Sequence, residues 1–254
     1  MFFRYLSTGT HALTEYRMNA PIDYNLLHKL SLMAREATCQ SVDFKRYGYP
    51  SDEILISGET DTVAVVCTGG NRTPLIIFGS DDDVWECLGD SFLMPFKEVD
   101  PGVRVDSGIH GLWVALRHMV LGKLRSMDSE TIMLAGHSVG GAVAVLAAAD
   151  IAANLPMVKP VVYTTGCLRI GDRRFTAKLS TLVPDFVQFE HPGDPVPRMP
   201  GGDYGSCWHR IGLECDGAAV LRIANAIPGV GRMFLKPYNE PSVYIDSLFN
   251  RIDT

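Results

Sequence analysis

Residues 136–140 read Gly-His-Ser-Val-Gly, so one serine stands between two glycines, two positions from each. A short apolar run that begins at Thr131 precedes the serine, and an Ala/Val-rich run follows it to Asn154. A buried strand, a sharp turn and a helix hold a nucleophilic serine on a strained elbow above a sheet, and glycines leave room for that turn. We therefore interpret Ser138 as a nucleophile.

A glycine-rich phosphate loop is the alternative interpretation of these residues. The stretch lacks the lysine of a P-loop and the glycine spacing of a dinucleotide fingerprint, which argues against that alternative. The helix behind Ser138 would direct backbone N–H groups and a partial positive charge at a developing oxyanion, and the N–H of Val139 is the first predicted donor. His137 is adjacent in sequence, but consecutive side chains diverge at an elbow, so we interpret it as a packing residue.

The rest of the chain supplies the elements that would position this serine. The predicted helices cover residues 22–40, 111–126, 140–154 and 172–182, and the predicted strands cover residues 62–68, 74–80, 131–136, 160–166 and 185–191. The first two strands flank a Gly-Gly-Asn-Arg turn, which is typical of a hairpin. Strands alternate with helices after residue 111, which indicates a mostly parallel sheet with helices on both faces. The predicted fold class is α/β.

Length and composition favour one globular domain. The 254 residues are 46 % hydrophobic and 20 % charged, which is ordinary for a chain with a sizeable core. We assign residues 18–254 to one domain and interpret residues 1–17 as a loosely attached N-terminal extension. The formal net charge of −6 argues against a general affinity for nucleic acid or for anionic membrane surfaces.

The six cysteines never form a C-x-x-C pair, so zinc ligation is not expected and a reducing compartment fits best. No apolar segment is long enough to span a bilayer, and the N-terminus lacks the continuous apolar stretch of a signal peptide. We therefore expect a cytoplasmic protein that needs neither a metal nor a cofactor. The oligomeric state is not predicted, and transient contact with a lipid interface stays open.

Five segments, in order along the chain, carry a resemblance to a known family. They are the turn Ile77-Phe78-Gly79-Ser80 with Trp85 after it, GHSVGGAVAVLAAA (136–149), TTGCLRIGDRRF (164–175), VQFEHPGDPVPRMP (187–200) and WHRIGLEC (208–215). The elbow resembles that of α/β-hydrolases, and the other segments resemble the fungal-type, or class 3, lipases, with Leu168 in place of a usual proline. The resemblance spans about residues 22 to 245. It implies an α/β-hydrolase fold and a lipase or esterase that hydrolyses carboxylic esters.

The resemblance also assigns further site residues. Asp194 would be the triad acid, in a Gly-Asp-Pro-Val-Pro turn whose prolines restrict φ. Ser80 would supply the second oxyanion donor. Phe78 stands where the family usually has an arginine and Asp106 where it often has a histidine, so we expect a divergent member. Residues 92–99 lie where the family carries its lid, and they would either cover the serine or simply pack.

The triad histidine is the open question. The chain order in this fold is Ser, Asp, His, and His209 alone among the seven histidines follows Asp194. His209 is therefore the candidate base by order, although its segment matches a family position that is not catalytic, which favours a structural hydrogen bond. The family's base precedes a C-terminal aromatic residue, where this chain has Asn239 or Glu240.

Loss of the histidine would change the function. Because an amide cannot act as a general base, a lipase-like pseudoenzyme or binding module is the alternative to the ester hydrolase. An acyl hydrolase of phospholipid or polyester is a third candidate, and it differs from the first only in its acyl pocket.

Overall fold

The computed structural model describes residues 23–38, 43–56, 62–69, 73–79, 96–206, 209–212 and 241–252. The helices are α1 (Tyr24–Thr38), α3 (Ser107–Arg125), α4 (Ser138–Asn154), α5 (Arg173–Leu182) and α7 (Pro241–Ile252), with short 3-10 helices η1 (Phe44–Tyr47) and η3 (Val196–Arg198). The strands are β1 (Ser51–Ile56), β2 (Val63–Thr68), β3 (Leu75–Gly79), β4 (Phe96–Asp100), β5 (Val103–Asp106), β6 (Thr131–His137), β7 (Lys159–Thr165), β8 (Phe186–Glu190) and β9 (Arg210–Gly212). The extension predicted at residues 1–17 lies outside the described residues, so this domain boundary stays a prediction.

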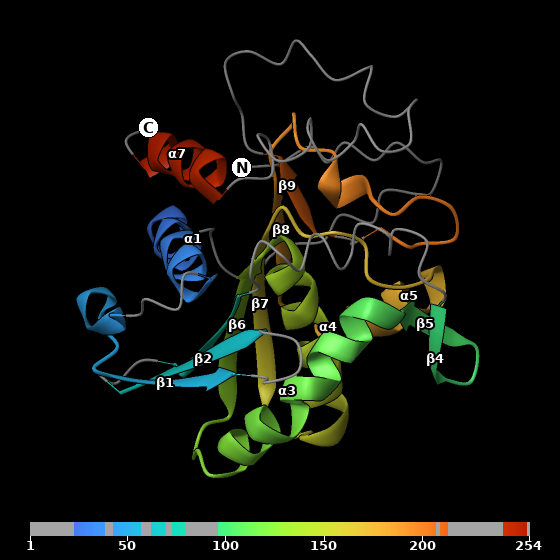
Figure 1. Ribbon diagram of the computed structural model, residues 1–254, viewed down its shortest axis with the longest axis horizontal. Coiled ribbons are helices and arrows are strands. Elements are labelled where there is room, and N and C mark those ends of the chain that lie inside the picture. The colour runs from blue at the N-terminus through green and yellow to red at the C-terminus, as the bar shows by residue number, and fades with distance from the viewer. Residues whose placement is uncertain are drawn as a thin grey trace.

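Seven of the described strands form one sheet in the order β1-β2-β3-β6-β7-β8-β9. The pairs β1–β2 and β2–β3 are antiparallel, and all pairs from β3 to β9 are parallel. Helices α1 and α7 lie on one side of this sheet, and α3, α4 and α5 lie on the other (Figure 1). The predicted α/β class is therefore confirmed, and so is the predicted hairpin of residues 62–68 and 74–80.

The central strand β6 is buried on both faces, which explains its nearly continuous apolar sequence. Ile132 and Leu134 pack in a cluster with α3 and α4, whereas Ala135 packs in a second cluster with α1. Helix α4 is apolar around most of its circumference because the sheet covers one side and neighbouring helices cover the other. Within the described residues, no helix combines the length and the apolarity that a membrane crossing requires.

Two aspartates set the starts of helices on this side of the sheet. The Asp106 side chain accepts hydrogen bonds from the backbone of Gly108 and Ile109 at 2.9 and 3.0 Å, so α3 begins four residues before the predicted start. Asp106 also accepts a hydrogen bond from the Tyr204 hydroxyl at 2.9 Å. The aspartate at this family histidine position thus has a structural role. Asp172 caps α5 in the same way.

The segment predicted as a lid contains a strand. Residues 96–99 belong to β4, which pairs with β5. The guanidinium of Arg104 lies 4.5 Å from the centre of the Phe96 ring and pairs with Asp172 at 3.1 Å, which ties this hairpin to the turn before α5. For these residues the structure argues against the lid alternative, since paired and anchored strands do not form a movable cover. Residues 92–95 lie outside the described residues.

Candidate active site

Ser138 lies where β6 ends and α4 begins, with a backbone φ of 52°. It is the one non-glycine residue with a positive φ in the described parts of the chain, and this conformation costs roughly 1–2 kcal/mol. A Cβ on Gly136 would overlap the backbone of Gly140, and a Cβ on Gly140 would overlap the carbonyl of Phe78. Both glycines are therefore needed for the turn, and the predicted strand–turn–helix elbow is confirmed.

The N-terminus of α4 is arranged to stabilise a negative charge at Ser138. The N-cap residue His137 makes no side-chain capping bond, and the first turn contains no acidic residue. The first N–H groups of a helix have no partner within it, so those of this turn, including the N–H of Val139, are suited to an oxyanion. Ser138 is buried, and its Oγ makes no hydrogen bond to any residue that the structure describes. Ser80 lies outside those residues, so its role as second donor stays a prediction.

Asp194 lies in the loop after β8 and is buried. Since β6 and β8 run parallel in one sheet, Ser138 and Asp194 both follow carboxyl ends of strands and lie at the same edge. Asp194 Oδ1 accepts a hydrogen bond from the N–H of Val196 at 2.9 Å. Oδ2 accepts a hydrogen bond from the hydroxyl of Tyr244 at 2.6 Å. The structure thus brings the predicted nucleophile and the predicted acid to one edge.

Tyr244 was not predicted as a site residue. It is fully buried on α7, and its hydroxyl also accepts a hydrogen bond from the backbone N–H of His191 at 3.2 Å. Burial, with the neighbouring Asp194 carboxylate, raises the pKa of Tyr244, so the phenol stays protonated and donates a hydrogen bond to the Asp194 carboxylate. The pair joins residues fifty positions apart. The apolar pattern of the helix predicts that this tyrosine lies in the core. It does not indicate that the hydroxyl binds a carboxylate.

The structure contradicts the assignment of His209 as the base. Its Nδ1 lies 2.8 Å from the carbonyl oxygen of Phe186, the first residue of β8. Phe186 shares a row with Leu134 of β6, four residues before Ser138. At about 3.3 Å per residue and about 4.8 Å per strand, the imidazole is on the order of 15 Å from the serine. A base must come within hydrogen-bond reach of its proton, so His209 has the structural role that its sequence segment favoured.

Two other imidazoles lie at the edge that carries Ser138, and both pack against the ring of Tyr244. His137 Nδ1 is 3.0 Å from the hydroxyl of Thr165. His191 Nδ1 accepts a hydrogen bond from the N–H of Gly193 at 3.2 Å, and burial lowers the pKa of this imidazole. A neutral ring that accepts at Nδ1 carries its proton on Nε2, so His191 is not arranged as a proton acceptor. Asn239 and Glu240 lie outside the described residues, and their correspondence to the base position stays a prediction.

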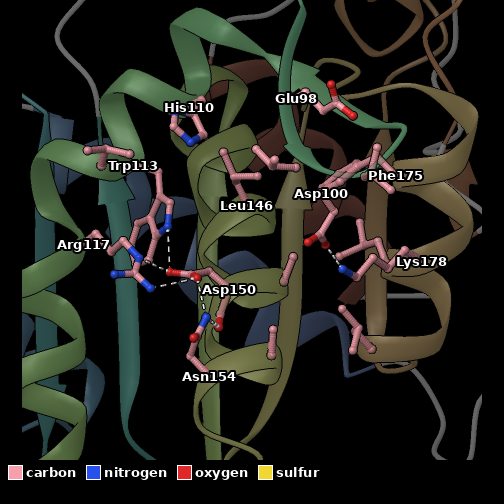
Figure 2. A pocket seen from close by; sticks show the side chains of 17 residues that line it. Glu98, Asp100, His110, Trp113, Arg117, Leu146, Asp150, Asn154, Phe175 and Lys178 are labelled. Carbon is pink, nitrogen blue, oxygen red and sulfur yellow. Dashed lines mark hydrogen bonds and ion pairs between the residues drawn. The ribbon is translucent and has the colours of Figure 1, made fainter.

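A groove of about 530 Å³ lies away from this edge, over the second half of α4 and between α3 and α5 (Figure 2). Its first lining residue on α4 is Leu146, about two helical turns beyond Ser138. The groove is therefore separate from the candidate site. In the described parts of the chain, no three His, Cys, Asp or Glu side chains are grouped to hold a metal ion.

Comparison with known proteins agrees with this architecture. Residues 80–204 match the lipase (class 3) family. The chain is 31 % identical over 121 residues to Lipase A of Sodiomyces alcalophilus, covering 41 % of this chain and 29 % of that protein. It is 34 % identical over 115 residues to the secreted mono- and diacylglycerol lipase 2 of Gibberella zeae, covering 40 % and 28 %. The crystal structure of a lipase from Rhizopus microsporus var. chinensis aligns with a TM-score of 0.62 at 24 % identity, covering 71 % of each chain.

The mostly parallel sheet with a serine elbow between β6 and α4 defines an α/β-hydrolase fold. Over residues 80–204 the chain is similar to the class 3 lipases, at low identity to each of the proteins compared. Its matched segments span less than a third of each of the two named relatives.

Proposed function

We propose that the chain hydrolyses carboxylic esters of lipids through an acyl-enzyme on Ser138. The observation that carries this proposal is the left-handed backbone of Ser138 at an uncapped helix N-terminus. Backbone strain costs free energy and gathers at functional sites, where the surrounding structure maintains it. Relatives named as a lipase and as a mono- and diacylglycerol lipase support lipid esters as the substrate class.

In the proposed reaction, Ser138 Oγ forms a bond to the ester carbonyl carbon while its proton passes to a base. The carbonyl electron pair moves onto the oxygen, where the N–H groups of the first turn of α4, including that of Val139, stabilise it. The alcohol then leaves with the proton that the base took up. Water attacks the acyl-enzyme in the same way and releases the carboxylic acid product from Ser138. Asp194 would orient the base and stabilise its cation. The reaction needs no cofactor.

A burst experiment tests this proposal. Rapid mixing with p-nitrophenyl butyrate should release one nitrophenol per chain before steady turnover begins. Ser138→Ala should lose both phases, with turnover falling on the order of 10⁴-fold or more. Ser107→Ala is the matched control, because Ser107 is also the first residue of a helix, α3, and does not belong to the elbow. Equal hydrolysis by the wild type and the Ser138→Ala variant would reject the proposal.

A lipase-like binding module is the second candidate function. The observation that favours it is the hydrogen bond from the Tyr244 hydroxyl to Oδ2 of Asp194. In a catalytic triad the carboxylate would instead accept a hydrogen bond from an imidazole. Such a module would bind an ester or acyl chain without turning it over. Calorimetry with an ether analogue of a diacylglycerol, beside turnover of the ester itself, separates the candidates. Binding without hydrolysis supports the module, and a Ser138-dependent burst rejects it.

The head group of the substrate is a finer part of the proposal. We propose neutral glycerides rather than phospholipids or polyesters, because the names of the two relatives refer to lipases of glycerides or of unspecified lipid. Rates on tributyrin, phosphatidylcholine vesicles and a polyester film compare the three classes directly. A rise in rate when tributyrin passes its solubility limit would support transient contact with a lipid interface.

We also propose a cytoplasmic location. It is supported by Cys67, which is a buried free thiol, and burial raises the pKa of Cys67 so that its thiol stays protonated. Fractionation of cells that express the full chain tests this location. Recovery from the medium would contradict it.

A further inference from the structure

Phe78 links the candidate site to the helical layer behind it. Its carbonyl lies against Gly140, in the first turn of the helix that carries Ser138 and Val139. Its side chain is fully buried and packs edge-on against Trp113 of α3. The two ring centres are 6.2 Å apart, and the ring planes make an angle of 74°. This phenylalanine replaces an arginine of the family pattern, and the structure shows that an aromatic contact occupies its place.

The indole of Trp113 is held in one orientation by Asp150 of α4. Trp113 Nε1 donates to Asp150 Oδ2 at 3.1 Å. Arg117 donates to both oxygens of the same carboxylate, from Nε at 2.6 Å and from Nη2 at 3.1 Å. Asn154 donates to Oδ1 at 2.7 Å. Figure 2 shows these bonds converging on Asp150 at one end of the groove. A carboxylate with four donors is fixed in position, and it fixes the ring that it binds.

We infer that Trp113 and Asp150 are positioning residues for the oxyanion-stabilising turn. Asp150 fixes the indole, the indole supports the Phe78 ring, and the backbone of Phe78 supports the first turn of α4. Displacement of a catalytic group by about 1 Å can lower a rate up to a hundredfold, and it acts on the transition state more than on substrate binding. This inference rests on the proposed function, since it names residues that would tune the same site.

Kinetics of Trp113→Phe test the inference. Phenylalanine keeps an aromatic ring beside Phe78 and removes the N–H donor that Asp150 holds. We expect kcat for p-nitrophenyl butyrate to fall about tenfold with KM unchanged, because only stabilisation of the developing oxyanion weakens. Val114→Ala is the matched control. Val114 is the next residue on α3 and is 49 % exposed, so this variant should match the wild type in both constants.

A double-mutant cycle tests whether Trp113 acts through Phe78. In a Phe78→Leu background, or in Phe78→Met if the first does not fold, Trp113→Phe should cause no further loss in kcat. Losses that multiply would overturn the inference, and so would a change confined to KM or an equal loss in Val114→Ala.

Amide hydrogen exchange gives a readout that does not depend on turnover. Exchange at Phe78 and Gly79 should be faster in Trp113→Phe and unchanged in Val114→Ala. If the wild type shows no Ser138-dependent hydrolysis, the proposed function fails, while this pattern of exchange would still support the contact chain from Trp113 to the end of β3. Unchanged exchange in Trp113→Phe, with hydrolysis intact, would overturn the inference alone.

Discussion

The elbow at Ser138 is assembled from residues within a few positions of one another, whereas the candidate acid Asp194 is held from distant parts of the chain. Gly136 and Gly140 leave the space for the turn, and the helix whose first N–H groups would stabilise an oxyanion starts at the serine itself. Asp194 instead receives a hydrogen bond from Tyr244, fifty positions further along the chain.

This difference separates two kinds of constraint. A sharp turn is limited by contacts between neighbouring residues, so its residue types reveal it directly. A buried carboxylate needs donors, and any element that packs nearby can supply them. The elbow should therefore fail when a local steric condition is broken, and the acid should respond to substitutions that are remote in sequence.

Gly140→Ala should have the largest effect, because it breaks the elbow itself. The new Cβ would overlap the carbonyl of Phe78, and the first turn of α4 would have to move. We expect kcat/KM to fall at least a hundredfold and the free energy of unfolding to fall by about 2 kcal/mol. Gly201→Ala is the control, since a Cβ there would have no neighbour within 4 Å. Equal behaviour of the two variants in ester hydrolysis and urea unfolding would contradict this account of the turn.

Asn239→His tests the acid half of the site and should raise the rate. If residue 239 is the vacant base position, an imidazole there would accept the proton of Ser138 and be oriented by Asp194. We expect kcat/KM to rise about tenfold and to follow a group that titrates near pH 6.5. A rise that persists in the double variant Asn239→His/Ser138→Ala would refute this mechanism, as would the absence of any rise in a folded variant.

Tyr244→Phe tests whether α7 supports the acid. The variant removes one hydroxyl, so Asp194 Oδ2 loses a buried donor while the aromatic contacts with His137 and His191 persist. We expect a loss of about 2 kcal/mol in the free energy of unfolding, because hydrogen bonds to buried charged groups are stronger than average. Tyr204→Phe removes a comparable hydrogen bond to a different carboxylate, that of Asp106. Only the Tyr244 variant should also lower kcat, and equal kcat in both would show that α7 has no part in the site.

His209→Ala should affect stability and leave chemistry unchanged, because its imidazole hydrogen-bonds to the first residue of β8, at the edge of the sheet opposite the serine. We expect about 1–2 kcal/mol less free energy of unfolding, from a carbonyl that loses its partner. A thousandfold fall in kcat with the fold intact would restore His209 as the base.

The pH dependence of stability should show the smallest effect. Burial lowers the pKa of His209 in the folded chain, so below about pH 6.5 the unfolded chain binds a proton that the folded chain does not. Stability should therefore fall as pH drops below about 6.5 and should level off once pH passes the lowered pKa. Urea unfolding between pH 7.5 and 5.5 measures this slope, which should be smaller in His209→Ala than in the wild type. His28, His110 and His191 also have lowered pKa values, so part of the slope should persist in the variant. An equal slope in the variant and the wild type would show that His209 does not contribute.

Local sequence patterns predicted much of this protein. The α/β class, the hairpin of β2 and β3 and the elbow at Ser138 follow from apolar periodicity and from glycines within a short window. Asp194 was assigned by the resemblance to class 3 lipases, and the restricted backbone of its Gly-Asp-Pro-Val-Pro turn is again a local property. The start of α3 was predicted four residues late because the capping role of Asp106 was not recognised.

Only the tertiary structure decided which of these residues meet. Chain order made His209 the candidate base, but strand direction decides the edge at which a side chain lies, and β9 begins at the edge opposite the serine. The bond from Tyr244 to Asp194 and the contact of Phe78 with Trp113 depend on how α7 and α3 pack against the sheet. Such pairings join residues far apart in the chain. These pairings are determined by the burial of apolar faces, which is a non-directional effect. The spacing of residues within one segment therefore does not encode which distant residue it will contact.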